Sequence, residues 1–395
     1  MQCTYDRSMS ETQRIEERLE QLLARFPNPG AAVRTAFRAA QYDLGLAWVH
    51  FREGSGGLGV DGALQAAVEE RLKSAGAPPR NDDYVAMHQA VSAIHTVGTD
   101  EQQERFMRPL FTGEDKWCQF FSEPGAGSDL AGVATSAVRD GDEWIVNGQK
   151  VWTSGALDAD LAFLLARTDP NVPKHRGLTL FVCAMNDPGI DVRPIRQADG
   201  AAHFNEVFLT DVRIPDTFRL GDIGSGWGVS MTALQSERQG TGAAWGRPTE
   251  AMVDAWREFG PTRPSALKDE VVRAWIDDRL ATLTLQRIQA MAGRQGAVSL
   301  GSLSKIAAGE ATQRMSALVL RIIGPGGQVG LDYGRVRGEE LLPSDPRLLA
   351  IRSRAMSIEG GTNEVQRNIL GERVLGLPGD IRVDKDRPWR EVPRS

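Results

Sequence analysis

The chain has 395 residues, 41% of them hydrophobic and 25% charged, which is an ordinary globular composition and argues against a disordered protein. Its 46 Lys and Arg against 52 Asp and Glu give a net charge of −6 without a basic block, which argues against nucleic acid as the main partner. The three cysteines form no CxxC pair, residues 1–25 lack the apolar segment of a secretion signal, and no apolar run is long enough to span a bilayer. We therefore expect a cytoplasmic protein without a membrane span.

Residues 1–114 have the apolar spacing of helices. The first predicted helix carries a single apolar stripe, formed by Ile15, Leu19, Leu22, Leu23 and Phe26. Two more helices are predicted at 61–74, with Asp61 as a suitable N-cap, and at 99–110, with Asp100 and Glu101 in the first turn.

Residues 115–225 change to the period of β-strands. Short runs of β type lie at 137–139, 143–146 and 150–153, separated by Asp140-Gly141-Asp142 and by Asn147-Gly148. Asn-Gly between alternating residues favours a tight turn, so both separators are predicted to be hairpin turns. Further strands follow with no helical stretch between them, which favours an antiparallel barrel or sandwich.

Residues 226–395 return to helical spacing. Helices are predicted at 270–291, 302–323 and 362–375, and the charged tail 380–395 is expected to be loosely attached. The predicted fold class is therefore α+β, with an N-terminal helical domain (1–114), a middle antiparallel β-barrel domain (115–225) and a C-terminal helical bundle (226–395).

Three sequence blocks carry a family resemblance. The segment Ser122-Glu123-Pro124-Gly125-Ala126-Gly127-Ser128-Asp129 opens the β region, and Asn147–Ser154 follows it about twenty residues later. A third block runs from Glu359 to Arg367. In this order and at these distances, the blocks resemble those of the acyl-CoA dehydrogenases, which are FAD enzymes built from a helical domain, a β-domain and a helical bundle. The resemblance covers nearly the whole chain.

The resemblance implies a flavin site in the β region. Phe121 and Ser122 would lie along the flavin, with Ser122 bonded to the pyrimidine part of the ring. Trp152 would cover the ring face away from the substrate, although a tryptophan in this position could also be an ordinary core residue. Thr153 and Ser154 would lie close to the cofactor, and the Ser154 hydroxyl near flavin N5 would stabilise negative charge as hydride arrives.

The glycine-containing loops are expected to contact the remaining parts of the two ligands. Gly127 lets the backbone approach a ligand closely, and Ser128 would contact the coenzyme A arm. Thr362 and Glu364 would bind the diphosphate and ribose side of FAD, at the start of a predicted helix. Thr362 could equally serve as an N-cap, and both roles can hold together.

Two glutamates are candidates for the catalytic base that removes the α-proton of the acyl-CoA thioester, while the β-hydrogen leaves as hydride. In much of the family the base precedes a Gly-Thr pair directly, but Gly360 occupies that position here and Glu359 lies one residue upstream. Members similar to isovaleryl-CoA dehydrogenase place the base in a Glu-Arg pair, which matches Glu237 and Arg238. We favour Glu237, with Arg238 positioning the CoA portion and the Gly360 amide donating to the thioester oxygen. An ordinary solvated helix pair is the alternative for Glu237 and Arg238.

Some blocks depart from the family pattern. The Gln-x-x-Gly-Gly block that contacts FAD from a neighbouring subunit is replaced by a segment containing Arg321 and Gly324, in which Arg321 could pair with a phosphate. The glycine cluster 221–226 does not follow a strand of a βαβ unit and is interpreted as the turn before the helix that carries Glu237. The histidines show no metal-ligand spacing, so no metal site is predicted.

The resemblance leads to one favoured function and two alternatives. The favoured function is an FAD-dependent acyl-CoA dehydrogenase of lipid catabolism that uses Glu237 as base and passes electrons to an electron-transfer flavoprotein. The alternatives are a flavin monooxygenase of the same fold and an FAD-free partner subunit of a heteromeric dehydrogenase. A homotetramer or a dimer-based heteromer is expected.

Overall fold

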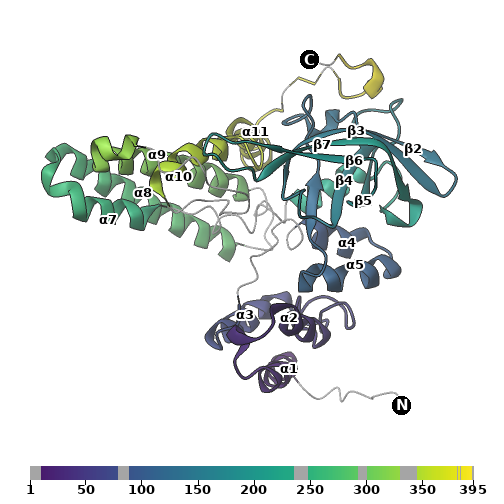
Figure 1. The fold of residues 1–395 in the computed structure, drawn as a ribbon, viewed down its shortest axis with the longest axis horizontal. Helices are drawn as coiled ribbons and strands as arrows, with labels where there is room; N and C mark the ends of the chain where they lie inside the picture. Colours follow the sequence, from purple (N-terminus) through teal and green to yellow (C-terminus); the bar gives the residue numbers. More distant parts are fainter. Residues whose placement is uncertain are drawn as a thin grey trace.

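A computed structural model describes residues 10–78, 89–234, 248–291, 300–329, 345–379, 381–382 and 384–393. Helices come first, a β-sheet follows, and a second set of helices ends the chain (Figure 1). The predicted order of a helical, a β and a helical region is confirmed.

The N-terminal helices begin and end close to the predicted positions. Ser10 caps the first helix because its hydroxyl accepts a hydrogen bond from the Gln13 amide, and the predicted stripe buries Ile15, Leu19 and Leu22. Asp61 caps a 3₁₀ turn that leads directly into the third helix. The second and fourth helices were not predicted. The helices are α1 (Glu11–Arg25), α2 (Arg34–Asp43), α3 (Gln65–Ser74), α4 (Val91–Val97) and α5 (Asp100–Thr112).

The middle region forms one eight-stranded sheet. The strands are β1 (Trp117–Phe120), β2 (Ser136–Asp140), β3 (Glu143–Ser154), β4 (Leu161–Arg167), β5 (Leu178–Ala184), β6 (Ile190–Ile195), β7 (Phe204–Pro215) and β8 (Arg219–Leu220). Their order is β6-β7-β3-β2-β4-β5-β8, and β1 pairs with β4. The prediction of a purely antiparallel arrangement was wrong for two pairs, because β1 and β2 both run parallel to β4. Every residue of β4 is buried, as is typical of a strand covered on both faces.

One of the two predicted hairpin turns is confirmed and the other is wrong. Gly141 lies in the turn that joins β2 to β3, where Asp140 pairs with Glu143. Asn147 and Gly148 instead lie inside β3, at an irregularity in its pairing with β7. A Cβ atom at Gly148 would lie 2.4 Å from the Thr135 hydroxyl oxygen, so glycine is required here by close approach of the neighbouring chain. The Asn147 side chain bonds to Asp211 across the pair.

The C-terminal helices stack beside the sheet (Figure 1). They are α7 (Thr249–Phe259), α8 (Ser265–Ala290), α9 (Gly301–Ile323), α10 (Pro346–Arg352) and α11 (Asn363–Ile369), and a π-helical turn Leu370–Val374 extends α11. All three predicted helices are present, although α8 begins five residues earlier than the predicted 270–291. Among the described helices, none combines the length and the apolar character that a membrane crossing requires.

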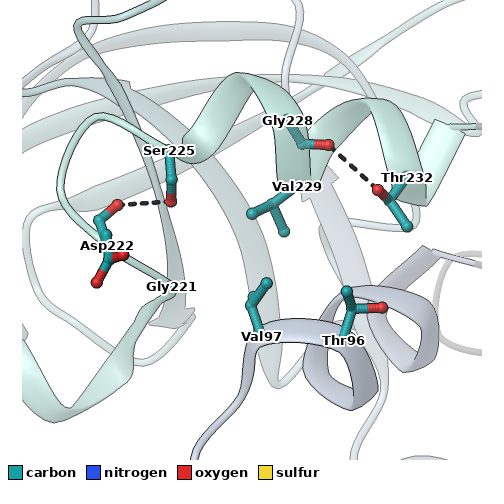
Figure 2. A pocket seen from close by; sticks show the side chains of 8 residues that line it. All are labelled: Thr96, Val97, Gly221, Asp222, Ser225, Gly228, Val229 and Thr232. Carbon is teal, nitrogen blue, oxygen red and sulfur yellow. Dashed lines mark hydrogen bonds between the residues drawn. The ribbon is translucent and has the colours of Figure 1, made fainter.

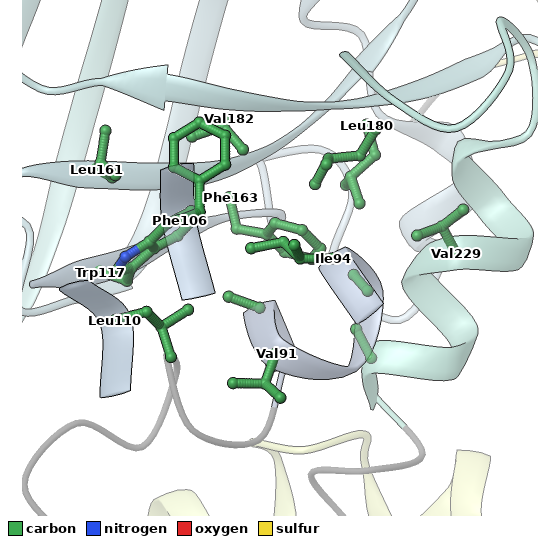
Figure 3. Close-up of a cluster of buried hydrophobic side chains, with 14 of the residues drawn as sticks. Val91, Ile94, Phe106, Leu110, Trp117, Leu161, Phe163, Leu180, Val182 and Val229 are labelled. Atoms are coloured by element: carbon green, nitrogen blue, oxygen red, sulfur yellow. The ribbon is translucent and has the colours of Figure 1, made fainter. Parts of the chain in front are cut away.

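One hydrophobic core joins α4 and α5 to the sheet (Figure 3), while α1 and α3 pack in a separate cluster. Val91 and Ile94 of α4 pack with Phe163 and Leu180 of the sheet, and Val229 enters from the helical segment 226–234. This segment follows the glycine cluster 221–226, as predicted. Phe121, which directly precedes the first motif, belongs to the same core. The first motif and the helical segment 226–234 are therefore anchored in one core.

Candidate functional site

The first two sequence blocks, Ser122–Asp129 and Asn147–Ser154, lie side by side and are called the first and the second motif below; Glu359–Arg367 is the third motif. The Val151 amide donates to the Ser122 carbonyl at 2.9 Å, which joins the segment after β1 to β3. Lys150 is fully buried, and its ammonium donates to the carbonyls of Phe121 and Leu165 and to the Glu123 carboxylate, at 3.1, 2.8 and 2.8 Å. A buried lysine with three oxygen partners fixes the position of Phe121 and Ser122 relative to β3.

Glu123 closes the loop that contains Gly127 and Ser128. Its carboxylate accepts hydrogen bonds from the amides of Ala134 and Thr135, at 2.6 and 2.9 Å, as well as from Lys150. Burial alone would raise the pKa of Glu123, but the Lys150 ammonium and the two amides hold this pKa below its ordinary value. Sequence reasoning passed over Glu123 and Lys150, although a charged residue in each motif beside apolar neighbours was an available signal.

Trp152 presents an exposed aromatic surface next to these motifs. Its backbone has a φ of 62°, at a second irregularity in the pairing of β3 with β7, and the residue is 60% exposed. The ring contacts Phe204 edge-on, with centroids 6.2 Å apart. A large apolar ring left exposed on a strained backbone is unusual, and it offers a flat surface to a planar ligand.

Two buried polar atoms beside Trp152 have no hydrogen-bond partner among the described residues. They are the Thr153 hydroxyl and the Asn205 side-chain oxygen. The Asn205 amide group donates to the Thr153 carbonyl at 2.9 Å, so the two residues form one unit. Ser154 ends β3 opposite Phe204 and is partly exposed. Buried polar atoms left unpaired in a protein are often completed by a ligand.

Gly127 and Ser128 lie on an exposed loop. The adjacent Asp129 carboxylate forms an ion pair with Lys174, at 3.0 Å. Ser128 is therefore accessible to a ligand, while its neighbour is tied to the β4–β5 connection.

Glu359 is engaged by a buried arginine. Both oxygens of its carboxylate accept hydrogen bonds from the Arg352 guanidinium, at 3.0 and 2.9 Å. The same guanidinium lies 5.7 Å from the centroid of the Phe204 ring, which also contacts Trp152. The row Glu359, Arg352, Phe204 and Trp152 thus connects the third motif to the second.

The glycine loop before α11 is held by several hydrogen bonds. Lys305 donates to the Gly361 carbonyl at 2.7 Å, and Gln366 donates to the Gly360 carbonyl at 2.8 Å. Gly361 has a φ of 88°, a backbone conformation that favours glycine at this position.

Thr362 is an N-cap, as one of its two predicted roles requires. Its hydroxyl accepts a hydrogen bond from the Val365 amide at 3.2 Å. Glu364 is exposed in the first turn of α11, and a hydrogen bond from its own backbone amide, together with one from Thr362, lowers its pKa. Glu364 is therefore accessible to a ligand, while Thr362 is partly exposed and its hydroxyl is engaged in the cap.

Arg321 and Gly324 lie apart from this group. Lys305, near the start of α9, contacts the Gly361 loop. Arg321 lies 16 residues further along the same helix, which at about 1.5 Å per residue is about 24 Å away. Arg321 forms an exposed ion pair with Glu270 of α8. At Gly324 the helix ends, and Arg263 donates to the carbonyls of Ile322 and Ile323. Within one chain, these two residues do not join the site formed by β3 and the Gly361 loop.

Glu237 and Arg238 lie outside the described residues. A groove of about 530 Å³ lies between α4 and the segment 226–234 that leads toward them (Figure 2). The hydroxyls of Ser225 and Thr232 in this groove donate to the carbonyls of Asp222 and Gly228, at 2.6 and 3.2 Å. Among the predicted site residues that the structure describes, none lines the groove.

Comparison with known proteins identifies the family. Models of the acyl-CoA dehydrogenase N-terminal, middle and C-terminal domains match residues 12–114, 118–212 and 224–375. Acyl-CoA dehydrogenase IpdE1 of Mycobacterium tuberculosis is 35% identical over 88% of this chain and 89% of its own length. The chain therefore belongs to the acyl-CoA dehydrogenase family and is an oxidoreductase that acts on a CH–CH bond.

Solved structures share the fold. An acyl-CoA dehydrogenase from Geobacillus kaustophilus has a TM-score of 0.69 and 25% identity, over 94% of this chain and 100% of its own. The ChsE4–ChsE5 complex from Mycobacterium tuberculosis has a TM-score of 0.69 and 24% identity, over 96% of this chain and 100% of the matched one. The arrangement of two helical regions around a β-sheet domain is thus that of the family.

The residues gathered at the end of β3 fit the flavin that the family typically uses. Trp152 supplies an exposed flat ring, and the orphaned atoms belong to the next residue of β3, Thr153, and to its partner on β7, Asn205. Ser122 lies next to the same part of β3 through the Val151 amide. This donor set and this surface suit a planar ring with polar edges.

Proposed function

We propose that this protein is an FAD-dependent acyl-CoA dehydrogenase that introduces a double bond between Cα and Cβ of an acyl-CoA thioester. The observation that carries the proposal is the exposed Trp152 ring beside the two orphaned polar atoms, with Ser122 joined to the same strand. When bound, FAD would accept the β-hydrogen as hydride. Trp152 would cover one face of the cofactor, and Ser122, Thr153 and Ser154 would bond to its edge.

The protein's own groups carry the proton chemistry. Glu237 would take the α-proton, so that the electrons of the Cα–H bond form the double bond as the β-hydrogen leaves with its electron pair. The Gly360 amide would donate to the thioester oxygen and stabilise the negative charge that develops there. Ser128 and Arg238 would hold the CoA portion, and Thr362 and Glu364 the diphosphate and ribose side of FAD.

The ion pair of Glu359 supports Glu237 as the base. The bidentate pair uses one lone pair of each carboxylate oxygen and turns the carboxylate toward the buried Arg352, which restricts its freedom to reach a proton on the substrate carbon. We therefore propose that Glu359 holds Arg352 beside Phe204 and that Glu237 performs the abstraction.

Anaerobic mixing with acyl-CoA thioesters tests this proposal. The panel contains short, branched, long and sterol-like acyl groups, and the absorbance of the flavin is recorded. We expect one class to bleach the wild-type flavin, and Glu237→Gln to slow the bleaching by about 10²–10⁴-fold while the flavin stays bound. The matched variant Glu359→Gln should retain the reaction within about tenfold.

Three results would contradict parts of the proposal. Bleaching of Glu237→Gln at the wild-type rate would exclude this base. A yellow protein that NAD(P)H bleaches and no thioester does would identify the monooxygenase alternative. A colourless protein would identify an FAD-free subunit of a heteromer.

We further propose an electron-transfer flavoprotein as the acceptor and a homotetramer or dimer-based heteromer as the assembly. Arg321 supports a shared site, because it is exposed at the far end of α9 and could contact a neighbouring subunit's cofactor. Reduction of added electron-transfer flavoprotein in the presence of the bleaching thioester tests the acceptor.

A further inference from the structure

The C-terminal segment 384–393 is docked on the middle domain, which contradicts the expectation of a loose tail. The Trp389 amide donates to the Val172 carbonyl at 2.9 Å, and the Arg390 amide donates to the Pro170 carbonyl at 3.1 Å. Pro388 and Pro173 form an antiparallel β-bridge directly beside the first of these bonds. The segment therefore pairs, strand-like, with the connection between β4 and β5.

The Trp389 side chain reaches the loop that follows the first motif. The ring is only 8% exposed, and its indole nitrogen donates to the Gly132 carbonyl at 3.2 Å. The Arg167 guanidinium lies 4.1 Å from the ring centroid and donates to the carbonyls of Ala131 and Val133, at 2.6 and 3.0 Å. The turn after Ser128 is thus held by a stacked tryptophan and arginine.

Lys174 makes a second connection between the tail and the motif. Its ammonium contacts the Asp384 carboxylate at 2.6 Å and the Asp129 carboxylate at 3.0 Å, and the lysine side chain is mostly buried. Asp129 directly follows Ser128. One lysine therefore ties the tail to the residue next to the proposed CoA contact.

The loop 125–132 is held mainly by anchors at its two ends. Gly125, Gly127 and Ser128 are all exposed, and a Cβ atom added at either glycine would meet nothing within 4 Å. The loop is anchored at one end by Glu123, and at its other end by the Arg167–Trp389 stack and Lys174. Ala126 is buried and exchanges two backbone hydrogen bonds with Glu123, whereas Gly127, Ser128 and Asp129 are exposed. The shape of the stretch after Ala126 therefore depends on the Arg167–Trp389 stack and on Lys174.

We propose that Trp389 and Asp384 are positioning residues that hold the loop 125–132 in the shape that binds the CoA arm of the substrate. This inference rests on the proposed function, in which Ser128 contacts that arm. Neither side chain is expected to touch the reacting atoms. Loss of either should therefore weaken substrate binding without slowing the chemical step.

Kinetics with two thioesters of one acyl group tests the proposal in the full chain. For the CoA thioester, we expect Trp389→Ala and Asp384→Asn to raise KM about tenfold while kcat stays within about twofold. For the N-acetylcysteamine thioester, which lacks most of the CoA arm, KM should not change. Asp386→Asn, which alters an exposed carboxylate of the same tail, is the matched control and should behave as the wild type.

Hydrogen exchange of the substrate-free protein tests the same idea without catalysis. Amides of residues 125–133 should exchange faster in both variants than in the wild type and in Asp386→Asn. If Trp389→Ala fails to fold, Trp389→Phe and Asp384→Asn carry the test, because both keep part of the anchor. Unchanged loop exchange, or equal KM changes for both thioesters, would overturn the proposal. If no thioester reacts with the wild type, the proposed function fails, and loop exchange alone decides whether the tail holds the loop.

Discussion

At the scale of single residues, the buried Lys150–Glu123 pair organises the site. The pair connects the first two of the three motifs that carry the family resemblance, and each partner also bonds to the backbone of the neighbouring segment. Removing one partner of a buried pair leaves the other charge uncompensated, which costs far more than losing a surface ion pair. These two side chains therefore matter for the position of Ser122 although both are buried.

Glu123→Gln should lower the free energy of unfolding by about 3–5 kcal/mol at pH 7. The folded-state pKa of Glu123 lies below its ordinary value of 4.5, so its contribution is complete above that pH and is lost as the pH falls through the folded-state pKa. The difference in free energy of unfolding between Glu123→Gln and the wild type should thus become smaller at acidic pH. Urea unfolding from pH 7 to pH 3 measures it.

Glu143→Gln is the control for this prediction. Glu143 forms an exposed ion pair with Arg213, and its loss should change the free energy of unfolding by less than about 1 kcal/mol. Equal effects of the two substitutions at pH 7 would show that the buried pair adds no particular stability.

At the scale of elements, β3 combines a strand with the surface that we propose binds the flavin. Its pairing with β7 is interrupted twice, and the second interruption turns Trp152 outward at a φ of 62°. A non-glycine residue in this region costs about 1–3 kcal/mol, which the surrounding sheet has to offset. Strain of this kind is expected where a side chain serves a ligand and not the core.

Trp152→Gly should separate flavin binding from stability. Relief of about 1–3 kcal/mol of strain roughly offsets the lost contact with Phe204, about 0.5–1.5 kcal/mol, so the melting temperature of the flavin-free protein should change little. Flavin affinity, measured by titration of the flavin-free protein, should fall at least about tenfold.

Asp211→Gly is the control, because Asp211 is the other described non-glycine residue with a positive φ. It lies on β7 away from Trp152 and bonds to Asn147, so its substitution should leave flavin affinity unchanged. If Trp152→Gly binds flavin with the wild-type affinity, Trp152 is not part of the cofactor site.

At the scale of the whole molecule, α8 exposes an apolar stripe. Along its length Val272, Trp275, Ile276, Leu280 and Leu283 are exposed, at intervals of three, one, four and three residues that place them on one helix face. In Figure 1, α8 lies in the helical stack away from the sheet. A stripe of this kind is typical of a subunit interface and supports the proposed oligomer.

Leu280→Glu combined with Leu283→Glu should break this assembly. Two charges buried in an apolar interface cost several kcal/mol, on the order of the binding free energy that one patch supplies. We expect the wild type to sediment as an oligomer of the 43.1 kDa chain and the double variant as a smaller species.

The control for the assembly is Val138→Glu, which places a charge on an exposed apolar residue of β2 in the middle domain. It should sediment as the wild type does. A double variant of α8 with the wild-type sedimentation coefficient would exclude α8 as the interface.

Much of the fold follows from local chemistry. The capping Ser10, the stripe of α1 and the turn at Gly141 act within a few residues of one another, so their elements are predictable from the sequence. Asn147-Gly148 has the same local turn chemistry as a hairpin, but its prediction was wrong because Thr135 and β7 impose a continuous strand. The local preference of Asn-Gly for a turn is overridden here by pairing with the neighbouring strands.

The sequence by itself determined the order of the three regions, the family and most of the residues now proposed to bind FAD and CoA. Only the tertiary structure decided that Glu123 pairs with Lys150, that Arg352 engages Glu359 and that Trp389 docks on the loop after the first motif. Lys150 is 27 residues from Glu123, and Trp389 is 257 residues from the Gly132 carbonyl that it contacts. Periodicity and capping describe only neighbouring residues, whereas these contacts depend on how distant segments pack together.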